Sequence, residues 1–237
     1  DLEYPITIED KAQGYQNTVA RITMSVHLPH QFRGTHMSRF IEILNAYRGF
    51  LSEASIFKML DEIQTRLDSH ESYFQAEFPY FIEKKAPVSG ALSLMNYQGI
   101  FMAEKKKWQT PSFILGVRVP LTSLCPCSRE ISQFGAHNQR SHVTVRIRYC
   151  QMVWLEDLIM WIESAASSEI YALLKREDEK YVTERAYQNP RFVEDMVREI
   201  AGRLKQDSNI MAFDIYAEHF ESIHNHNVFA QISSGRL

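Results

Sequence analysis

The segment from residue 124 to residue 142 concentrates the side chains of this sequence that could hold a metal ion. Cys125 and Cys127, two of the three cysteines, are followed by His137 and His142. Thiolate and imidazole groups are suitable ligands for Zn²⁺ and similar divalent ions. A single C-x-C pair excludes a closed four-cysteine site, so a metal here would also need histidine or carboxylate ligands and could keep a position open for water. Two buried free thiols and a turn stabilised by histidine hydrogen bonds fit the spacing equally well.

A second polar cluster, residues 218–227, lies near the end of the sequence. It holds three of the nine histidines together with Glu218 and Glu221. Carboxylate and imidazole groups that lie side by side can exchange protons near neutral pH. His224 and His226 would lie beside a carboxylate if the chain turns at residues 223–225. A polar hairpin tip without a catalytic role is the alternative, because His and Asn are common in turns.

Acidic residues precede and enter the last predicted helix. Glu177, Asp178 and Glu179 form one run, and Glu194 lies off the apolar stripe of the helix that ends near Leu204. An exposed Glu near a helix N-terminus usually does no more than interact favourably with the helix dipole. From its position alone, Glu194 is therefore predicted to be a solvated surface residue.

The elements that must position these clusters follow from the spacing of apolar residues, with period 2 for strands and 3.6 for helices. The first half of the chain predicts a strand, two helices and two strands, at residues 20–28, 37–44, 56–67, 74–82 and 89–105. The second half predicts two strands, three helices and two strands, at residues 113–119, 143–149, 154–163, 167–175, 189–204, 211–219 and 228–232. Asn189 and Pro190 are expected to be the N-cap and first residue of the last helix. This order favours an α+β fold of two antiparallel sheets with helices on one face of each.

The composition is that of an ordinary globular protein, with 237 residues, 45% hydrophobic and 23% charged. A formal net charge of −3 gives no sign of a nucleic-acid partner. Three cysteines argue against a disulfide framework and fit a reducing compartment. No apolar run approaches the roughly 20 residues that span a bilayer, and no signal segment opens the chain. We therefore expect a cytoplasmic protein with neither a nucleic-acid nor a membrane partner.

Five motifs, in this order along nearly the whole chain, resemble the GTP cyclohydrolase IB family. They are Gly34-Thr35-His36-Met37-Ser38-Arg39-Phe40, Ala86-Pro87-Val88-Ser89-Gly90, Ser123-Leu124-Cys125-Pro126-Cys127-Ser128, Gly135-Ala136-His137-Asn138-Gln139-Arg140-Ser141 and Glu221-Ser222-Ile223-His224-Asn225-His226. The resemblance implies a tunnelling fold (T-fold) with two similar modules, residues 1–110 and 111–237, the second carrying most site residues. It further implies a barrel-like homotetramer with active sites near subunit interfaces.

The resemblance also implies the roles of individual residues. Cys125, His137 and Glu179 would bind a divalent metal (Zn, Mn or Fe(II)), and no organic cofactor is expected. Glu194 would bind guanine, because a carboxylate accepts the ring N1–H and the exocyclic amino group as a fork. The residues expected to be catalytic are Cys125, Cys127, Glu221, His224 and His226. The candidates for binding the triphosphate are Arg129, Arg140, Lys84 and Lys85.

The implied activity is that of GTP cyclohydrolase I, a hydrolase acting on a cyclic amidine. Water activated by the metal would attack C8 of GTP, and His224 or His226 would protonate the opening ring. Formate and 7,8-dihydroneopterin triphosphate would result, at the start of folate, other pterin or queuosine-type synthesis. Three alternatives stay open: an archaeal-type cyclohydrolase that yields a 2′,3′-cyclic phosphate, a non-catalytic purine- or pterin-binding protein of the same fold, and a structural zinc protein. Cys125 and His137 together disfavour the second alternative.

Overall fold

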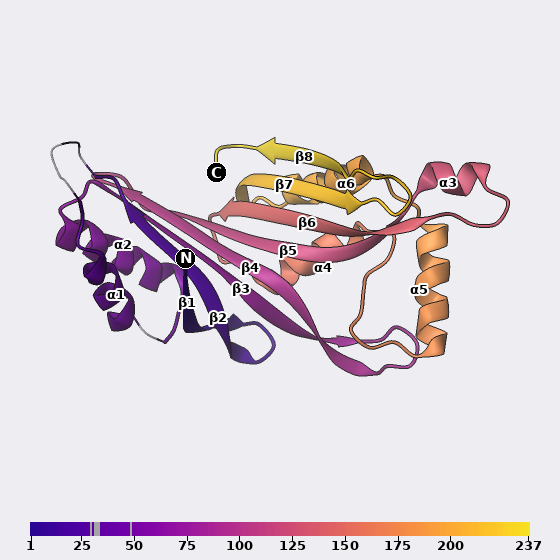
Figure 1. Ribbon diagram of the computed structural model, residues 1–237, viewed down its shortest axis with the longest axis horizontal. Coiled ribbons are helices and arrows are strands. Elements are labelled where there is room, and N and C mark those ends of the chain that lie inside the picture. The colour runs from indigo at the N-terminus through magenta and orange to yellow at the C-terminus, as the bar shows by residue number, and fades with distance from the viewer. Residues whose placement is uncertain (29, 31–33, 48) are drawn as a thin grey trace. The chain divides into compact units, whose positions relative to one another are not determined.

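The computed structural model describes residues 1–28, 30, 34–47 and 49–237. The elements, labelled in Figure 1, are β1 (Leu2–Asp10), β2 (Gly14–Val26), α1 (Met37–Ala46), α2 (Glu53–Leu67), β3 (Glu71–Lys85), β4 (Leu92–Lys106), β5 (Ser112–Leu124), α3 (Pro126–Ile131), β6 (Asn138–Tyr149), α4 (Leu155–Ser164), α5 (Arg176–Gln188), α6 (Val193–Gln206), β7 (Ile210–Phe220) and β8 (Val228–Ser234). The eight strands are hydrogen-bonded in sequence order, β1 to β8, in one sheet. The prediction of two separate sheets is therefore wrong: the strands form one sheet, in which strands that follow one another in sequence are paired.

The chain divides into two compact units. The first comprises Asp1–Pro79 and Gly99–Leu115, and the second comprises Tyr80–Gln98 and Gly116–Leu237. Strands β3, β4 and β5 each contribute residues to both units. The division into T-fold modules at residues 1–110 and 111–237 stays a prediction.

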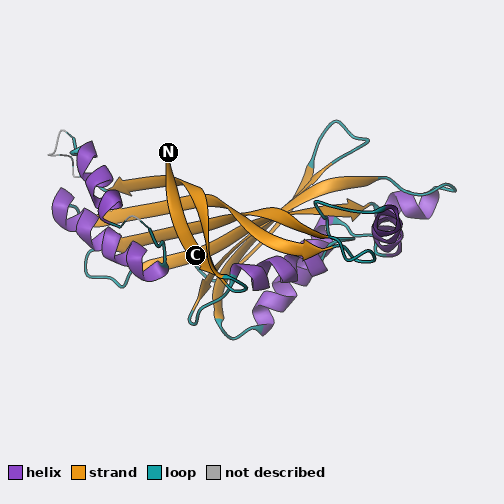
Figure 2. Ribbon diagram, turned by 90° about the horizontal axis from the view of Figure 1, so that it is seen from below, coloured by secondary structure: helices purple, strands orange, loops and turns teal. Residues whose placement is uncertain are grey.

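In the first unit, β1 and β2 form an antiparallel hairpin, in which Ile6 pairs with Thr18 and Ile8 with Gln16. Alternate residues of these strands are buried, as expected for a sheet with one covered face. Helices α1 and α2 lie on one face of the strands (Figure 2).

The core of the first unit requires a glycine at position 99. The ring of Phe78 lies edge-on to that of Phe101, with 4.8 Å between the ring centroids. A Cβ atom at Gly99 would lie 2.4 Å from the Phe78 ring, closer than carbon atoms can approach. Glycine therefore lets the aromatic ring pack directly on the neighbouring backbone.

In the second unit, β6, β7 and β8 are antiparallel, with Val143 opposite Ala217 and Ile215 opposite Ile232. Helices α4 and α6 lie on one face of these strands (Figure 2). The apolar face of α6 packs against the core, and its residues Met196, Val197, Ile200, Ala201 and Leu204 are buried. The remaining two helices, α3 and α5, bury few of their residues.

Two predictions about the segment between α4 and α6 are wrong. Residues 167–175 form no helix, because Ser168 makes a bridge to Thr122 of β5 and the backbone there is extended. Asn189 and Pro190 do not start α6, which begins at Val193 with Phe192 as its N-cap. Asn189 is instead the C-cap of α5.

Among the described residues, no helix combines the length and the apolar character needed to cross a membrane.

Candidate active site

A cavity of about 550 Å³ in the second unit brings together six of the predicted site residues, which are Cys125, His137, Glu194, Glu221, His224 and His226. Its lining also includes Gln139, Arg191, His219 and Phe229, to which the sequence analysis had assigned no role. The cavity therefore joins the Cys125 loop, the N-terminus of α6 and the β7–β8 connection, which are far apart in sequence. A thiol, several imidazoles and two carboxylates facing one space can bind a metal and exchange protons.

Backbone hydrogen bonds hold Cys125 and His137 next to each other. The N–H of Cys125 donates to the carbonyl oxygen of His137 over 3.1 Å. The N–H of His137 donates to Oγ of Ser128 over 3.2 Å, and the N–H of Ser128 donates to Sγ of Cys125 over 3.4 Å. These three bonds form a closed ring through Cys125, Ser128 and His137, so the backbone of His137 is held against the Cys125 loop.

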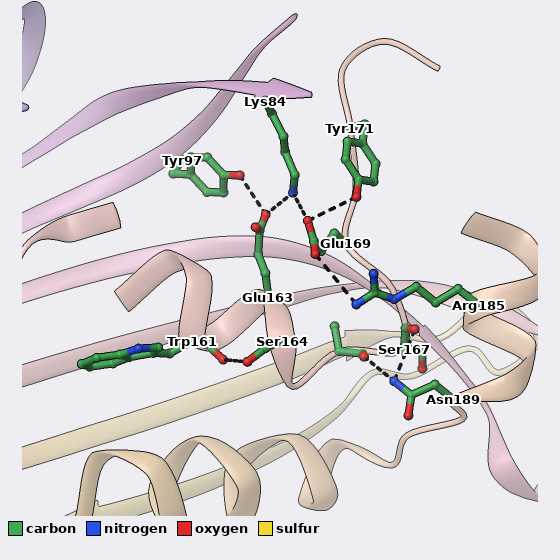
Figure 3. Close-up of polar contacts among 11 residues, drawn as sticks. Lys84, Tyr97, Trp161, Glu163, Ser164, Ser167, Glu169, Tyr171, Arg185 and Asn189 are labelled. Carbon is green, nitrogen blue, oxygen red and sulfur yellow. Dashed lines mark hydrogen bonds and ion pairs between the residues drawn. The ribbon is translucent and has the colours of Figure 1, made fainter. Parts of the chain in front are cut away.

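The residue before Cys125 is fixed from both sides. The N–H of Leu124 donates to Oγ of Ser167 over 3.0 Å, and the carbonyl oxygen of Leu124 accepts from the N–H of Arg191 over 3.1 Å. Asn189 in turn donates from its side-chain amide to the carbonyl oxygens of Ala166 and Ser167, over 2.8 and 3.5 Å (Figure 3). The non-helical segment after α4 therefore ties the end of β5 to the chain that leads into α6.

A buried chain of side-chain contacts starts at the ring of His137. Its Nδ1 lies 3.1 Å from Oε1 of Gln139, and Nε2 of Gln139 donates to Oγ of Ser123 over 3.0 Å. Oγ of Ser123 lies 2.9 Å from Oγ of Ser141 and 3.4 Å from Nδ1 of His219. Ser123, Ser141 and Gln139 are buried, so these contacts exclude water.

His219 is a neutral histidine at the inner side of the cavity. Only 2% of the residue is exposed, and its Nε2 lies 3.3 Å from Sδ of Met196. Burial lowers the pKa of His219 from 6.5 to about 4, although the charge of Glu194 acts in the opposite direction. The imidazole is therefore uncharged near neutral pH and does not neutralise Glu194.

Glu194 lies in the first turn of α6 and faces the cavity. Its neighbour Asp195 provides the helix cap, because Oδ2 of Asp195 accepts from the N–H of Phe192 over 3.1 Å. The capping role is thus filled by one carboxylate, and the exposed Glu194 carboxylate is placed where a ligand can meet it. Glu194 is exposed, as its position in the helix predicted. The helical pattern did not show that Glu194 also lines a cavity with Cys125 and His137.

His224 and His226 lie on the connection between β7 and β8. Their rings are stacked, with 5.3 Å between centroids and 20° between planes, and both residues are exposed. Asn227 donates to Oε1 of Glu218 over 3.0 Å and closes the turn beside them. Two exposed imidazoles therefore lie together on a turn that lines the cavity.

The other predicted residues are not among those that line this cavity. Cys127 is exposed on α3, Arg129 lies 4.8 Å from the ring centroid of Tyr187, and Arg140 and Lys85 are exposed on strands. Glu179 is exposed on α5 and lines a different cavity, together with Arg176, Lys180, Thr183 and Glu184.

Lys84 is buried among carboxylates instead of facing solvent (Figure 3). Its Nζ lies 2.6 Å from Oε1 of Glu163 and 2.8 Å from Oε2 of Glu169. The Tyr97 hydroxyl also donates to Glu163, over 2.8 Å, and Nη2 of Arg185 lies 3.9 Å from Glu169. Burial raises the pKa of Glu163, and the charge of Lys84 opposes this effect. The Lys84 ammonium is thus engaged in balancing two carboxylates within the unit.

The motif Ala86–Gly90 is anchored to the start of α5 by Asp178. Its carboxylate accepts from the N–H groups of Val88 and Ser89 and from the N–H of Lys175, and it accepts from Oγ of Ser89. Burial opposes ionisation of Asp178, but these four hydrogen bonds hold its pKa below the ordinary value. Asp178 therefore fixes the helix turn that carries Glu179.

The chemistry of Cys125 and His137 fits a divalent metal of the borderline-soft kind. Both line one cavity, and their relative position is set by hydrogen bonds. Within the described part of the chain, no three His, Cys, Asp or Glu residues already converge as a complete ligand set. The structure therefore offers two donors that line one cavity, with further carboxylate and imidazole groups in the same lining.

The strand order and the one-sided helices define an α+β protein of the tunnelling-fold class. The chain is similar to uricase from Arthrobacter globiformis, with a TM-score of 0.60 and 8% identity, over 100% of this chain and 91% of that one. It is also similar to urate oxidase from Bacillus sp. TB-90, with a TM-score of 0.56 and 10% identity, over 93% and 88% of the two chains. At such identities the similarity shows the fold alone, and it confirms the predicted fold class.

The sequence then defines the family. The chain belongs to the type I GTP cyclohydrolase folE2 family, whose sequence model matches residues 1–230. It is 56% identical over 236 residues to GTP cyclohydrolase FolE2 of Pelobacter propionicus, covering 100% of this chain and 91% of the relative. It is 53% identical over 236 residues to GTP cyclohydrolase FolE2 of Geobacter sulfurreducens, with the same coverage of both proteins. The predicted family is confirmed.

Proposed function

We propose that this chain hydrolyses GTP at C8 of the guanine, releases formate and forms 7,8-dihydroneopterin triphosphate, the first step of folate and related pterin synthesis. The observation that carries the proposal is the single cavity shared by Cys125, His137, Glu194 and the two histidines of the β7–β8 connection. Family membership supplies the reaction, and the cavity supplies groups suited to each part of it.

Glu194 is the proposed guanine-binding residue. Guanine presents the N1–H and the exocyclic amino group side by side, and one carboxylate accepts both. Glu194 lies on the cavity wall, and the neighbouring His219 is neutral and does not offset its charge. A ligand that offers two N–H donors would suit this carboxylate.

Cys125 and His137 are the proposed protein ligands of a Zn, Mn or Fe(II) ion. When bound, such an ion supplies Lewis acidity that makes water nucleophilic near neutral pH. Glu179 is the proposed third ligand, although it lines a different cavity of this chain. We propose that sites are completed in a homotetramer, where one site draws on more than one subunit.

The proposed proton transfers fall to the β7–β8 connection. His224 or His226 protonates the ring nitrogen as the bond to C8 opens, and Glu221 and Cys127 are proposed to assist. The stacked, exposed imidazoles can be reprotonated from solvent between turnovers.

The triphosphate needs cationic partners. Arg129, Arg140 and Lys85 stay proposed contacts, and Lys84 could take part only by giving up its buried carboxylate partners. Arg191 is an additional candidate, because it lines the cavity. Its Nη1 also forms an ion pair with Glu199 over 2.9 Å.

The test is turnover of GTP labelled with ¹³C at C8, followed by mass spectrometry of both products. We expect labelled formate together with an unlabelled dihydroneopterin triphosphate. A 2′,3′-cyclic phosphate would instead assign the archaeal-type reaction, and GTP binding without labelled formate would assign a non-catalytic binding protein of this fold.

A further inference from the structure

The two buried nitrogen atoms of His219 have neighbours of different chemistry. Nε2 lies 3.3 Å from the thioether sulfur of Met196, which can accept a hydrogen bond but cannot donate one. In a neutral imidazole one nitrogen carries the proton and the other carries a lone pair. The contact with Met196 places the proton on Nε2, so Nδ1 of His219 is the acceptor.

The acceptor Nδ1 of His219 determines how the amide of Gln139 is oriented. Nδ1 lies 3.4 Å from Oγ of Ser123 and 3.5 Å from Nε2 of Gln139, which can both donate. The same amide nitrogen donates to Oγ of Ser123 over 3.0 Å. The reverse orientation would turn Oε1 of Gln139 toward the lone pair of His219, and two acceptors would face each other. Because Gln139 is only 6% exposed, water cannot take over the missing contact.

With its amide nitrogen on the Ser123 side, Gln139 presents Oε1 to the ring of His137. Nδ1 of His137 lies 3.1 Å from that oxygen, and an oxygen acceptor there requires a proton on Nδ1. Oγ of the exposed Ser222 lies 3.4 Å from the same nitrogen, and a hydroxyl can accept as well as donate, so the fixed amide of Gln139 is the deciding partner. The lone pair of the ring is then on Nε2. A neutral imidazole binds a metal through its lone pair, and the partner of its other nitrogen sets which nitrogen that is.

We propose that Gln139 is a positioning residue that holds His137 in the Nδ1–H tautomer and leaves Nε2 as the metal-binding nitrogen, with the choice set by the buried His219–Met196 contact. The metal consequence rests on the proposed function, whereas the tautomer is a property of the protein alone. Contacts in the structure thus run from Met196 through His219 and Gln139 to the candidate ligand.

The first test is nitrogen NMR of the full chain, ¹⁵N-labelled at histidine and free of metal, with His137 assigned by its loss in His137→Asn. The expected result is Nδ1–H for His137 and Nε2–H for His219. Nε2–H at His137 in the wild-type protein would overturn the proposal. This measurement needs neither metal nor GTP. It therefore tests the tautomer of His137 even if the proposed GTP hydrolysis is not observed.

The second test measures Co(II) affinity by the visible spectrum. Gln139→Leu is expected to weaken binding roughly 10- to 100-fold, as for other groups that orient metal-binding histidines. Gln139→Glu keeps an oxygen acceptor beside Nδ1 and is expected to restore most of the affinity and the Nδ1–H signal. Gln133→Leu, at an exposed position in the same loop, is the matched control. Unchanged affinity in Gln139→Leu would contradict the proposal, and should that variant fail to fold, the wild-type tautomer still decides.

Discussion

The backbone N–H of Cys125 donates a 3.1 Å hydrogen bond to the carbonyl oxygen of His137, and this bond joins the two donors proposed to hold the metal. Ser128 contacts both residues, since its Oγ accepts from the backbone N–H of His137 and its N–H donates to Sγ of Cys125. The cost of ordering the loop is therefore met during folding, before a ligand arrives. Sites held this way bind with less loss of conformational entropy.

Removal of the thiol should abolish both metal retention and turnover. Cys125→Ala deletes a proposed ligand, while the backbone bond to His137 does not depend on the side chain. We expect the purified variant to contain little metal, measured by elemental analysis, and to release no formate. Cys150→Ala, which changes an exposed cysteine that does not line the cavity, should keep both properties. An active, metal-replete Cys125→Ala protein would exclude the thiol from the site.

Neutralising Glu194 should separate substrate binding from metal binding. Glu194→Gln keeps the shape but presents an amide to the guanine donors, so the fork of two hydrogen bonds is lost. GTP affinity measured by calorimetry should fall by about two orders of magnitude, as expected for loss of two charge-assisted bonds of about 1.5–3 kcal/mol each with partial replacement by water. Metal content should not change. Loss of metal would show that Glu194 is a ligand instead.

Lys84 and Lys85 offer a matched pair, since one is buried between carboxylates and its neighbour is exposed. Lys84→Met leaves Glu163 and Glu169 without their cation and should lower the free energy of unfolding by about 3 kcal/mol. Lys85→Met should change it by less than about 0.5 kcal/mol. Urea unfolding measures both values. If Lys84→Met were as stable as the wild type and raised only the KM for GTP, Lys84 would be a triphosphate contact.

The buried His219 should make stability depend on pH. Its pKa is about 4 in the folded protein and 6.5 when unfolded, so the unfolded chain binds more protons between these values. The contribution of neutral His219 to the free energy of unfolding is fully present above pH 6.5. It is lost as the pH falls toward 4, and the total loss is about 3 kcal/mol. Urea unfolding of the wild type and of His219→Asn at pH 7 and pH 5 measures it. The variant should lose less stability than the wild type on acidification; equal losses would mean that His219 does not titrate in this way.

Much of the fold was predictable because the spacing of apolar residues within a short segment indicates a strand or a helix. The helix 56–67 and the strand 143–149 lie within α2 and β6, and their predicted apolar residues are buried except Leu67 and Tyr149, which are half-buried. The amphipathic stripe of α6 was equally clear, although its start was misplaced. Strand β1 was overlooked despite a readable alternation that buries Ile6 and Ile8.

The errors arise where distant contacts decide the backbone. Residues 167–175 are not helical because Ser167 and Ser168 bind β5, far away in sequence. Helix α5 was missed because it is polar on nearly every side, with only Asp178 and Ala186 buried. Neither feature leaves a periodic signal.

Six of the predicted site residues line one cavity, whereas Cys127 and Glu179 do not, and the residues that support Cys125 and His137 had no predicted role. Cys125 and His137 are recognisable from chemistry and motif, and they share a cavity. Gln139 and Ser141 follow His137 at every second position, a spacing that places them on one face of a strand. Their contact with Ser123 and His219 depends on strand pairing, which the sequence of one strand does not contain.

The most direct test of the account is GTP turnover by metal-stripped protein, with Mn(II), Fe(II) or Zn(II) added back separately. Formate and the oxidised, fluorescent pterin are followed together. The account predicts no formate without metal, and formate with a neopterin product after at least one metal is restored. GTP binding without formate under all three metals would contradict it.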